Sequence, residues 1–214
     1  FSVTPEQRSI AALLLNHPNP TVTEGALRAL IAQPDLAREL IKDEWLEEAA
    51  ASSDSKRRRL AALAVSARGD QGTEVLHRLL DDSDPAVVEA AFHSAGSLQN
   101  REYVPTMVRR LSEPKLRGSA IEALSAYGER IVGTLGDLLH DNQVPLAIRR
   151  QIPRVLRLIP SQRAVDVLLG FISDPDLALR AGVLRALNRL RESAPNLDYG
   201  AKSVTEQVSS EARY

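Results

Sequence analysis

The stretch DPAVVEAAF at residues 84–92 decides the fold that this sequence predicts. Its Asp-Pro pair is typical of a helix start, because the carboxylate can cap a backbone N–H and proline sacrifices no hydrogen bond at the first helical position. The apolar side chains that follow recur at the spacing of one helical face. A second such run, VLHRLL, lies just before the corner at residues 75–80. The sequence therefore predicts a helix, a tight corner and another helix.

This pattern recurs along the chain. Prolines stand at positions 85, 114, 145 and 175, at intervals of 29, 31 and 30 residues, and Asp54-Ser55 extends the series backward by another 30. Glycine or polar breaks separate the two helices of a unit, at residues 68–70, 98–100, 127–129 and 159–161. A lone helical pair cannot bury its apolar stripe, so repetition predicts pairs that stack on a continuous core. We expect an all-α fold, a right-handed α-solenoid of about five to six helical pairs of roughly 30 residues.

Local features refine this expectation. Small residues at equivalent positions should let neighbouring helices approach closely, namely Ala62, Ala91, Ala120 and Ala181. Pro153 falls inside an expected helix over residues 148–159, where it removes a backbone donor and should kink the helix. The kink could act as a hinge or be a tolerated irregularity of one repeat.

The chain divides into three parts by its regularity. Residues 1–53 predict less regular capping helices over 4–15, 23–31 and 36–51, residues 54–193 carry the repeats, and residues 194–214 lose the apolar period and predict a linker or a truncated helix. The start, Phe1-Ser2-Val3-Thr4, has neither a signal peptide nor an initiator methionine. We therefore expect a piece of a longer protein.

Composition excludes several classes of function. The absence of cysteine rules out disulfides, thiolate zinc sites and a cysteine nucleophile, and it favours a reducing, cytoplasmic compartment. Aromatic residues make up only 4% of the chain, which favours helices packed through aliphatic side chains over a sheet. No apolar run approaches the length of a membrane span.

No catalytic or cofactor motif is present. The four histidines, His17, His77, His93 and His140, lie in different units without the paired spacing of a metal site. The sequence has no nucleophile elbow, phosphate loop or dinucleotide fingerprint. We expect no enzyme activity, no metal and no cofactor.

The repeating unit resembles a known family. An Asp-Pro corner, an arginine, an alanine-rich helix and a Leu-Leu helix, repeated over residues 54–191, are similar to the short HEAT repeat. The resemblance implies a scaffold for protein partners or for adjacent domains of the same polypeptide. HEAT-like iron hydroxylases use repeated His-Glu pairs, which this chain does not contain.

Arginines are the candidate binding residues. In HEAT units the helix after the corner lines the concave face, so the resemblance implies one basic groove. Arginine binds carboxylate and phosphate through two parallel hydrogen bonds, so the groove could take an acidic partner, a phosphate group, a nucleotide or nucleic acid. Alternatively, these arginines pair with corner acids, as Asp174 could with Arg149 or Arg150. The candidates are Arg57, Arg58, Arg117, Arg149, Arg150, Arg154, Arg180 and Arg185.

The balance of charge and aromatic residues ranks the alternatives. Residues 115–191 hold 12 Lys and Arg against 7 Asp and Glu, but the whole chain has a formal net charge of −1 and a single tryptophan, Trp45. Specific nucleic-acid binders usually carry a clear basic excess, and single-strand binders carry stacking aromatics. HEAT-like lyases and glycosylases need convergent acids or aromatics, and no such cluster repeats in register. Protein binding is therefore the favoured interpretation.

A second, looser resemblance concerns context. Residues 84–214, and within them the stretches at 127–130, 144–149 and 190–199, are similar to HEAT regions that follow a nucleotide-translocase-like or major-facilitator-like membrane domain. Some proteins of that kind also carry a cyclic-nucleotide-binding domain. This resemblance implies a cytoplasmic regulatory or bracing module beside a membrane transporter.

Overall fold

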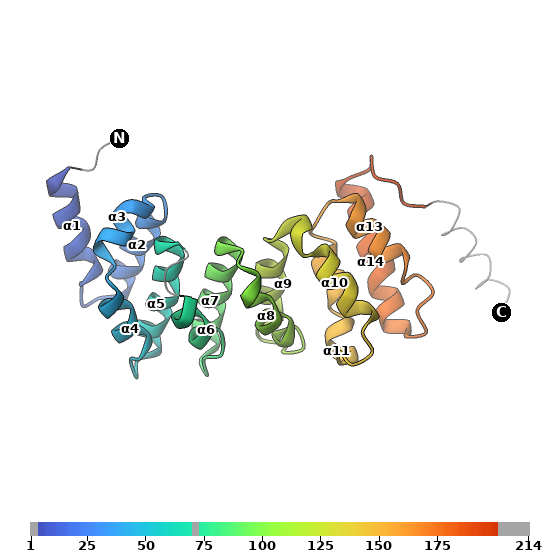
Figure 1. Ribbon diagram of the computed structural model, residues 1–214, viewed down its shortest axis with the longest axis horizontal. Coiled ribbons are helices and arrows are strands. Elements are labelled where there is room, and N and C mark those ends of the chain that lie inside the picture. The colour runs from blue at the N-terminus through green and yellow to red at the C-terminus, as the bar shows by residue number, and fades with distance from the viewer. Residues whose placement is uncertain (1–3, 70–72, 201–214) are drawn as a thin grey trace. The chain divides into compact units, whose positions relative to one another are not determined.

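The computed structural model describes residues 4–69 and 73–200, and every regular element within those ranges is a helix (Figure 1). The chain forms two compact units, Phe1–Met107 and Val108–Tyr214. The expected all-α fold of repeated helical pairs is confirmed. The handedness of a superhelix concerns both units together and stays a prediction.

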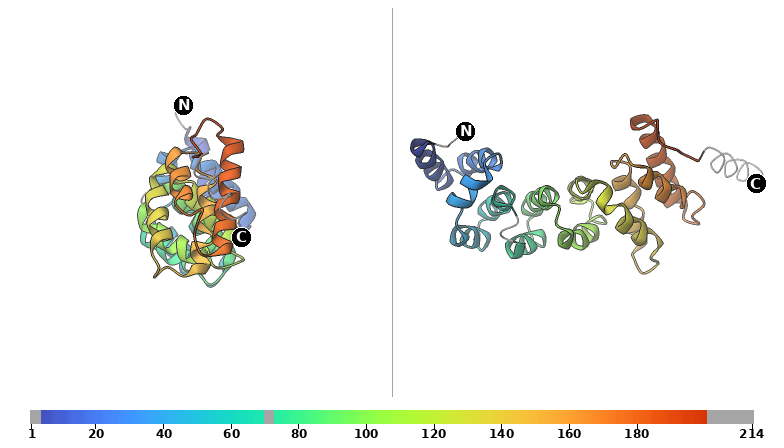
Figure 2. Two further views of the ribbon diagram at one scale, coloured as in Figure 1. Left: turned by 90° about the vertical axis from the view of Figure 1, so that its right-hand side faces the viewer. Right: turned by 45° about the horizontal axis from the view of Figure 1, so that its top comes forward.

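Unit 1 contains successive helical pairs, which the right-hand view of Figure 2 shows nearly end-on. Its first helix begins with a capping box, in which the Thr4 side chain accepts from the Gln7 N–H and the Gln7 side chain accepts from the Thr4 N–H. The elements are α1 (Pro5–Leu15), α2 (Pro20–Ile31), α3 (Pro34–Leu40), α4 (Asp43–Ala50), α5 (Ser55–Arg68), α6 (Thr73–Leu80), α7 (Pro85–Leu98), η1 (Arg101–Tyr103) and the start of α8 (Val104–Arg110).

Close contact between α5 and α7 builds the centre of unit 1, and α5 also packs against α2 and α4. Ala62 of α5 and Ala91 of α7 are fully buried. Ser94 Oγ of α7 donates a 2.6 Å hydrogen bond to the carbonyl oxygen of Ala62. A side chain can reach the neighbouring main chain in this way only where small residues let the helices touch.

Unit 2 continues the alternation of helices with short turns. Its last helix packs against α12 and α13 and buries Leu179, Val183 and Leu190. Helix α10 approaches α13 at Gly136, where a Cβ would lie 3.2 Å from Val167 Cγ2. The elements are α9 (Arg117–Ser125), η2 (Gly128–Ile131), α10 (Val132–His140), α11 (Leu146–Arg149), α12 (Ile152–Leu156), α13 (Gln162–Leu169) and α14 (Leu177–Ser193).

The breaks inside the repeats fall where the sequence predicts them. Gln99 and Gly128 both adopt positive φ, 53° and 59°, at the ends of the α7 and α9 segments. Gly69 follows α5 with φ of 83°, and residue 70 of the same expected break lies outside the described residues. Left-handed backbone of this kind terminates a helix and turns the chain back.

The acid-proline corners behave less uniformly than expected. At Asp84-Pro85 the carboxylate caps the helix and α7 begins at the proline. At Asp174-Pro175 the helix begins two residues later, because the Asp174 side chain accepts from the Asp176 N–H and leaves Asp176 to cap α14. After Pro114 the chain turns before α9 begins at Arg117.

Two expected continuous helices are wrong. The helix over residues 36–51 is divided into α3 and α4 because Ile41 is extended and points into the core, with 1% of its surface exposed. The helix over 148–159 is divided into α11 and α12. Pro153 lies in the first turn of α12, where its missing N–H costs nothing, so it follows a break and does not kink a continuous helix.

The expectation for small residues holds at three positions and fails at Ala181. Ala62, Ala91 and Ala120 are fully buried, whereas Ala181 is exposed. The later start of α14 changes which face meets the core, and Ala186 is buried on that face instead.

The expected division at residues 53/54 and 193/194 stays a prediction. Helix α14 ends at Ser193, and Tyr199 Oη then donates a 2.8 Å hydrogen bond to the Ala194 carbonyl oxygen. The remainder of the expected linker or truncated helix, residues 201–214, lies outside the described residues.

Replacing Ala62 with leucine should destabilise unit 1 by about 2 kcal/mol, because the larger side chain must push α5 away from α7. Chemical denaturation followed by circular dichroism measures the change. The same substitution at exposed Ala181 should change the free energy of unfolding by less than about 0.5 kcal/mol. Equal effects at the two positions would contradict the close contact of α5 with α7.

Candidate functional site

One predicted arginine forms a partly buried ion pair in unit 1. Arg58 donates from Nε and Nη2 to the two carboxylate oxygens of Asp82 at 2.7 and 2.9 Å, and its Nη1 donates to the carbonyl oxygens of Ser52 and Ser53. The side chains of the pair are 17% and 9% exposed. The hydrogen bonds from Arg58 hold the pKa of the Asp82 carboxyl below its usual value. Arg58 thus stabilises a corner of the repeat.

A corresponding pair of arginines lies at the last corner of unit 2. Arg150 donates from Nε and Nη2 to the two oxygens of Asp176 at 2.9 and 2.6 Å. Arg149 lies 3.9 Å from the Asp174 carboxylate and donates to Asn142 Oδ1 at 3.1 Å. The sequence allowed Asp174 to pair with Arg149 or with Arg150, and in the structure it pairs with Arg149. Arg150 pairs with Asp176, the N-cap residue of α14.

Other predicted arginines also make internal contacts. Arg117 donates to the carbonyl oxygens of Leu111 and Ser112 at 2.9 and 3.1 Å. Arg180 donates to the Asp174 carbonyl oxygen at 3.1 Å. Arg57 pairs with Glu48 at 3.0 Å and lies with Trp45 at a hollow of about 340 Å³ in unit 1. Arg57, Arg117 and Arg180 thus use internal partners, and a single groove formed by all eight predicted arginines stays a prediction.

Several arginines gather at one groove of unit 2, between α12 and α14. The groove has a volume of about 410 Å³. Arg154 and Arg185, which the sequence analysis predicted, line it together with Arg150. Arg157 lines it as well and was missed, although its spacing of three from Arg154 places both on one helical face. We call these four residues the arginine groove.

Three of the four cations in the arginine groove pair with no carboxylate of the described part of the chain. Arg154, Arg157 and Arg185 are exposed, and across residues 4–69 and 73–200 no carboxylate forms an ion pair with them. Asp176 neutralises only Arg150. The groove therefore presents three uncompensated guanidinium groups at a surface that a partner can reach.

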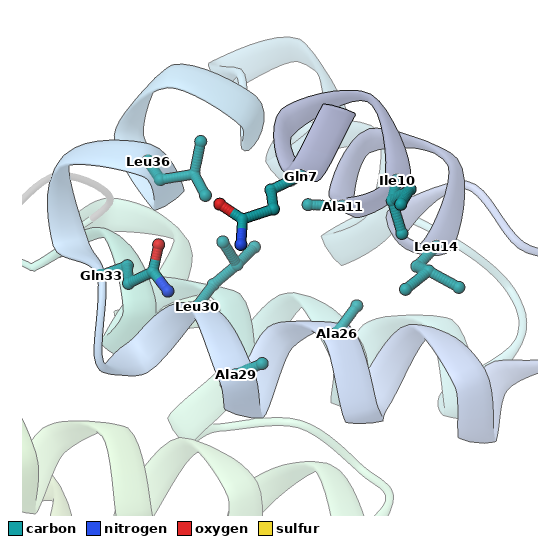
Figure 3. A pocket seen from close by; sticks show the side chains of 9 residues that line it. All are labelled: Gln7, Ile10, Ala11, Leu14, Ala26, Ala29, Leu30, Gln33 and Leu36. Carbon is teal, nitrogen blue, oxygen red and sulfur yellow. The ribbon is translucent and has the colours of Figure 1, made fainter. Parts of the chain in front are cut away.

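A second hollow, in unit 1, is apolar. It has a volume of about 230 Å³ and lies between α1, α2 and α3 (Figure 3). Ile10 and Leu14 of α1 line it and are 56% and 36% exposed, and Leu30 of α2 and Leu36 of α3 lie opposite. Gln7 and Gln33 supply its polar side chains. This hollow offers apolar contact area, and none of the residues that line it is charged.

Neither a metal centre nor a membrane span is found in the part of the chain that the structure describes. No group of three or more His, Asp or Glu side chains is placed to hold a metal ion. None of the described helices is both long and apolar enough to cross a membrane.

The family comparison agrees with the architecture. Residues 42–125 match the family described as HEAT repeats. That stretch is similar to HEAT repeats. It runs from α4 to α9 and bears out the expected repeat, while the arginine groove of α12 and α14 lies outside it. No curated protein sequence matches the chain.

Solved structures resemble the chain at low similarity. A crystal structure of an engineered protein has 18% identity and a TM-score of 0.46 over 87% of this chain and 97% of that one. A designed armadillo repeat protein in complex with the peptide (KR)4 has 16% identity and a TM-score of 0.40 over 85% and 98%. Such values carry no conclusion about a partner.

The pKa of Asp176 gives a testable property of the last corner. Hydrogen bonds from Arg150, and then from the Leu179 N–H, lower the pKa of this carboxyl from 3.8 to about 2. Because the pKa is lowered in the folded state, the ionised carboxylate stabilises the fold at pH values above the ordinary pKa. This contribution is lost as pH falls from about 4 to about 2.

Carbon-detected NMR of the Asp176 carboxyl should therefore give a titration midpoint of about 2. In Arg150→Gln the midpoint should rise toward 3.8, because the largest cause of the shift is removed. An unchanged midpoint in the variant would contradict the pairing of Arg150 with Asp176.

Proposed function

We propose that this protein is a non-enzymatic protein-interaction scaffold that binds an anionic segment of a partner in the arginine groove of unit 2. The observation that carries the proposal is the cluster of three exposed arginines that have no counter-ion among the residues the structure describes. Arg58, Arg149 and Arg150 use corner carboxylates, so internal pairing accounts for them. It does not account for Arg154, Arg157 and Arg185.

The physical reason for binding an anionic partner is the electrostatic repulsion between like charges at one surface. Guanidinium groups that lie at one groove repel each other, and a carboxylate or phosphate partner relieves the repulsion and gains charge-assisted hydrogen bonds. Arginine suits this role because its planar fork meets both oxygens of a carboxylate. Of the eight arginines predicted from sequence, the proposed binding face keeps Arg154 and Arg185. Arg157 is added to it. Arg150 lines it too and also pairs with Asp176.

The alternatives have less support from the groove. A phosphate group could meet the same guanidinium groups, so phosphate and nucleotide remain outcomes of the experiment. Nucleic-acid binders of single strands stack bases on aromatic rings, and none of the residues that line the groove is aromatic. A HEAT-like lyase or glycosylase would require an acid in the groove, and Asp176 is already held by Arg150 and by the α14 N-terminus.

We also propose that the scaffold lies on the cytoplasmic side of a membrane, beside a transporter-like domain of the same polypeptide. The resemblance of residues 84–214 to HEAT regions of such proteins supports this context. The complete reading frame should then encode apolar segments of membrane-spanning length. A frame without such segments would overturn this part of the proposal.

Charge reversal tests the binding face. Wild-type protein should bind a fluorescein-labelled glutamate-rich peptide, with an affinity that falls as salt rises because the contacts are ionic. Arg154→Glu/Arg185→Glu should weaken binding at least about tenfold, since each substitution replaces an attraction with a repulsion. Fluorescence anisotropy at low and physiological salt measures both effects.

A double variant elsewhere in unit 2 is the matched control. Arg163→Glu/Arg191→Glu changes the net charge equally, and both side chains are exposed and do not line the groove. It should bind within about twofold of the wild type. Equal loss in both double variants would mean that net charge alone attracts the peptide, and the binding face would be rejected.

A further inference from the structure

The arginine groove has a floor as well as charged walls. Arg154 and Arg157 come from the end of α12, and Arg185 comes from α14. The other lining residues are Gln151, which precedes α12, Pro153 of α12, and Ala178, Gly182 and Ala186 of α14. All of them except Gln151 are small or rigid. The three residues of α14 are four positions apart, so they form one stripe on the helix. No long side chain of this stripe fills the space between the arginines.

Gly182 lies where α14 comes close to the break between α11 and α12. A Cβ at this position would lie 3.8 Å from the Arg150 carbonyl oxygen and from Pro153 Cγ, which is ordinary contact. The main chain of α14 therefore packs directly against the break between α11 and α12. An alanine fits at position 182, whereas a longer side chain must extend into the groove.

These features together favour one ligand chemistry. A floor lined mainly by small side chains lets the main chain of a ligand approach closely, while arginines on both walls bind groups that project sideways from it. Carboxylates on a polypeptide match the fork of arginine. A phosphate ion needs the arginines but makes no use of the floor, and a nucleic acid would lack rings to stack on.

We propose that the groove holds an acidic polypeptide segment whose main chain lies over Gly182 and whose carboxylates bind Arg154 and Arg157 on one wall and Arg185 on the other. This inference rests on the proposed function and specifies its ligand. It makes shape, as well as charge, a condition for binding.

Filling the floor without changing charge tests this inference. Gly182→Leu should weaken binding of the glutamate-rich peptide at least about tenfold, while Gly182→Ala should bind within about twofold of the wild type. Both substitutions raise helix propensity, so the helix should persist, and circular dichroism with thermal unfolding checks this. ATP and a short single-stranded DNA, titrated in parallel, should bind more weakly than the peptide to the wild type.

The outcomes separate this inference from the proposed function. If Gly182→Leu binds the peptide like the wild type while Arg154→Glu/Arg185→Glu does not, the charges act alone, the floor has no role and the inference is overturned. If ATP or DNA binds more tightly than the peptide, the ligand is a phosphate compound and the acidic polypeptide is rejected. If the wild type does not bind the peptide at all, both proposals fail.

Discussion

Close contact between neighbouring helices through small side chains is the constraint on which the rest of each unit depends. A helical pair of this chain buries its apolar stripe only against the next pair, and the α5–α7 contact is close enough for Ser94 Oγ to reach the Ala62 carbonyl oxygen at 2.6 Å. Gly136 serves the same purpose between α10 and α13. The core is shared among many aliphatic side chains, so their burial depends on how closely neighbouring helices pack.

The corners that join these closely packed helices must satisfy backbone groups and hold charged side chains. A corner exposes backbone groups at a helix start, and its carboxylates both cap those groups and bind arginines. Asp176 accepts from the Leu179 N–H and also holds Arg150, while Asp82 accepts from the Asp84 N–H and holds Arg58. Arg58 is thereby largely withdrawn from the surface, whereas Arg150 stays partly exposed and lines the arginine groove.

The arginine groove is distinct because three of its four cations are not held by corner acids. These three cations, Arg154, Arg157 and Arg185, lie along α12 and α14. No carboxylate among the described residues forms an ion pair with them. The apolar hollow of unit 1 differs in chemistry, since Ile10, Leu14 and Leu30 offer area without charge. A partner attracted by charge would therefore select the groove of unit 2.

The sequence by itself determined the all-α fold, the length of the repeat and the breaks at Gln99 and Gly128, because apolar period, capping residues and turn residues act over a few neighbouring positions. It also indicated arginines as the informative residues. Only the tertiary structure decided that Ile41 divides a helix, that α14 starts after Asp176, and which arginines remain uncompensated. Arg150 and Asp176 are 26 residues apart, and Arg154 meets Arg185 only because α12 packs against α14. Such pairings depend on how helices distant in sequence pack together, and no local pattern encodes that distance.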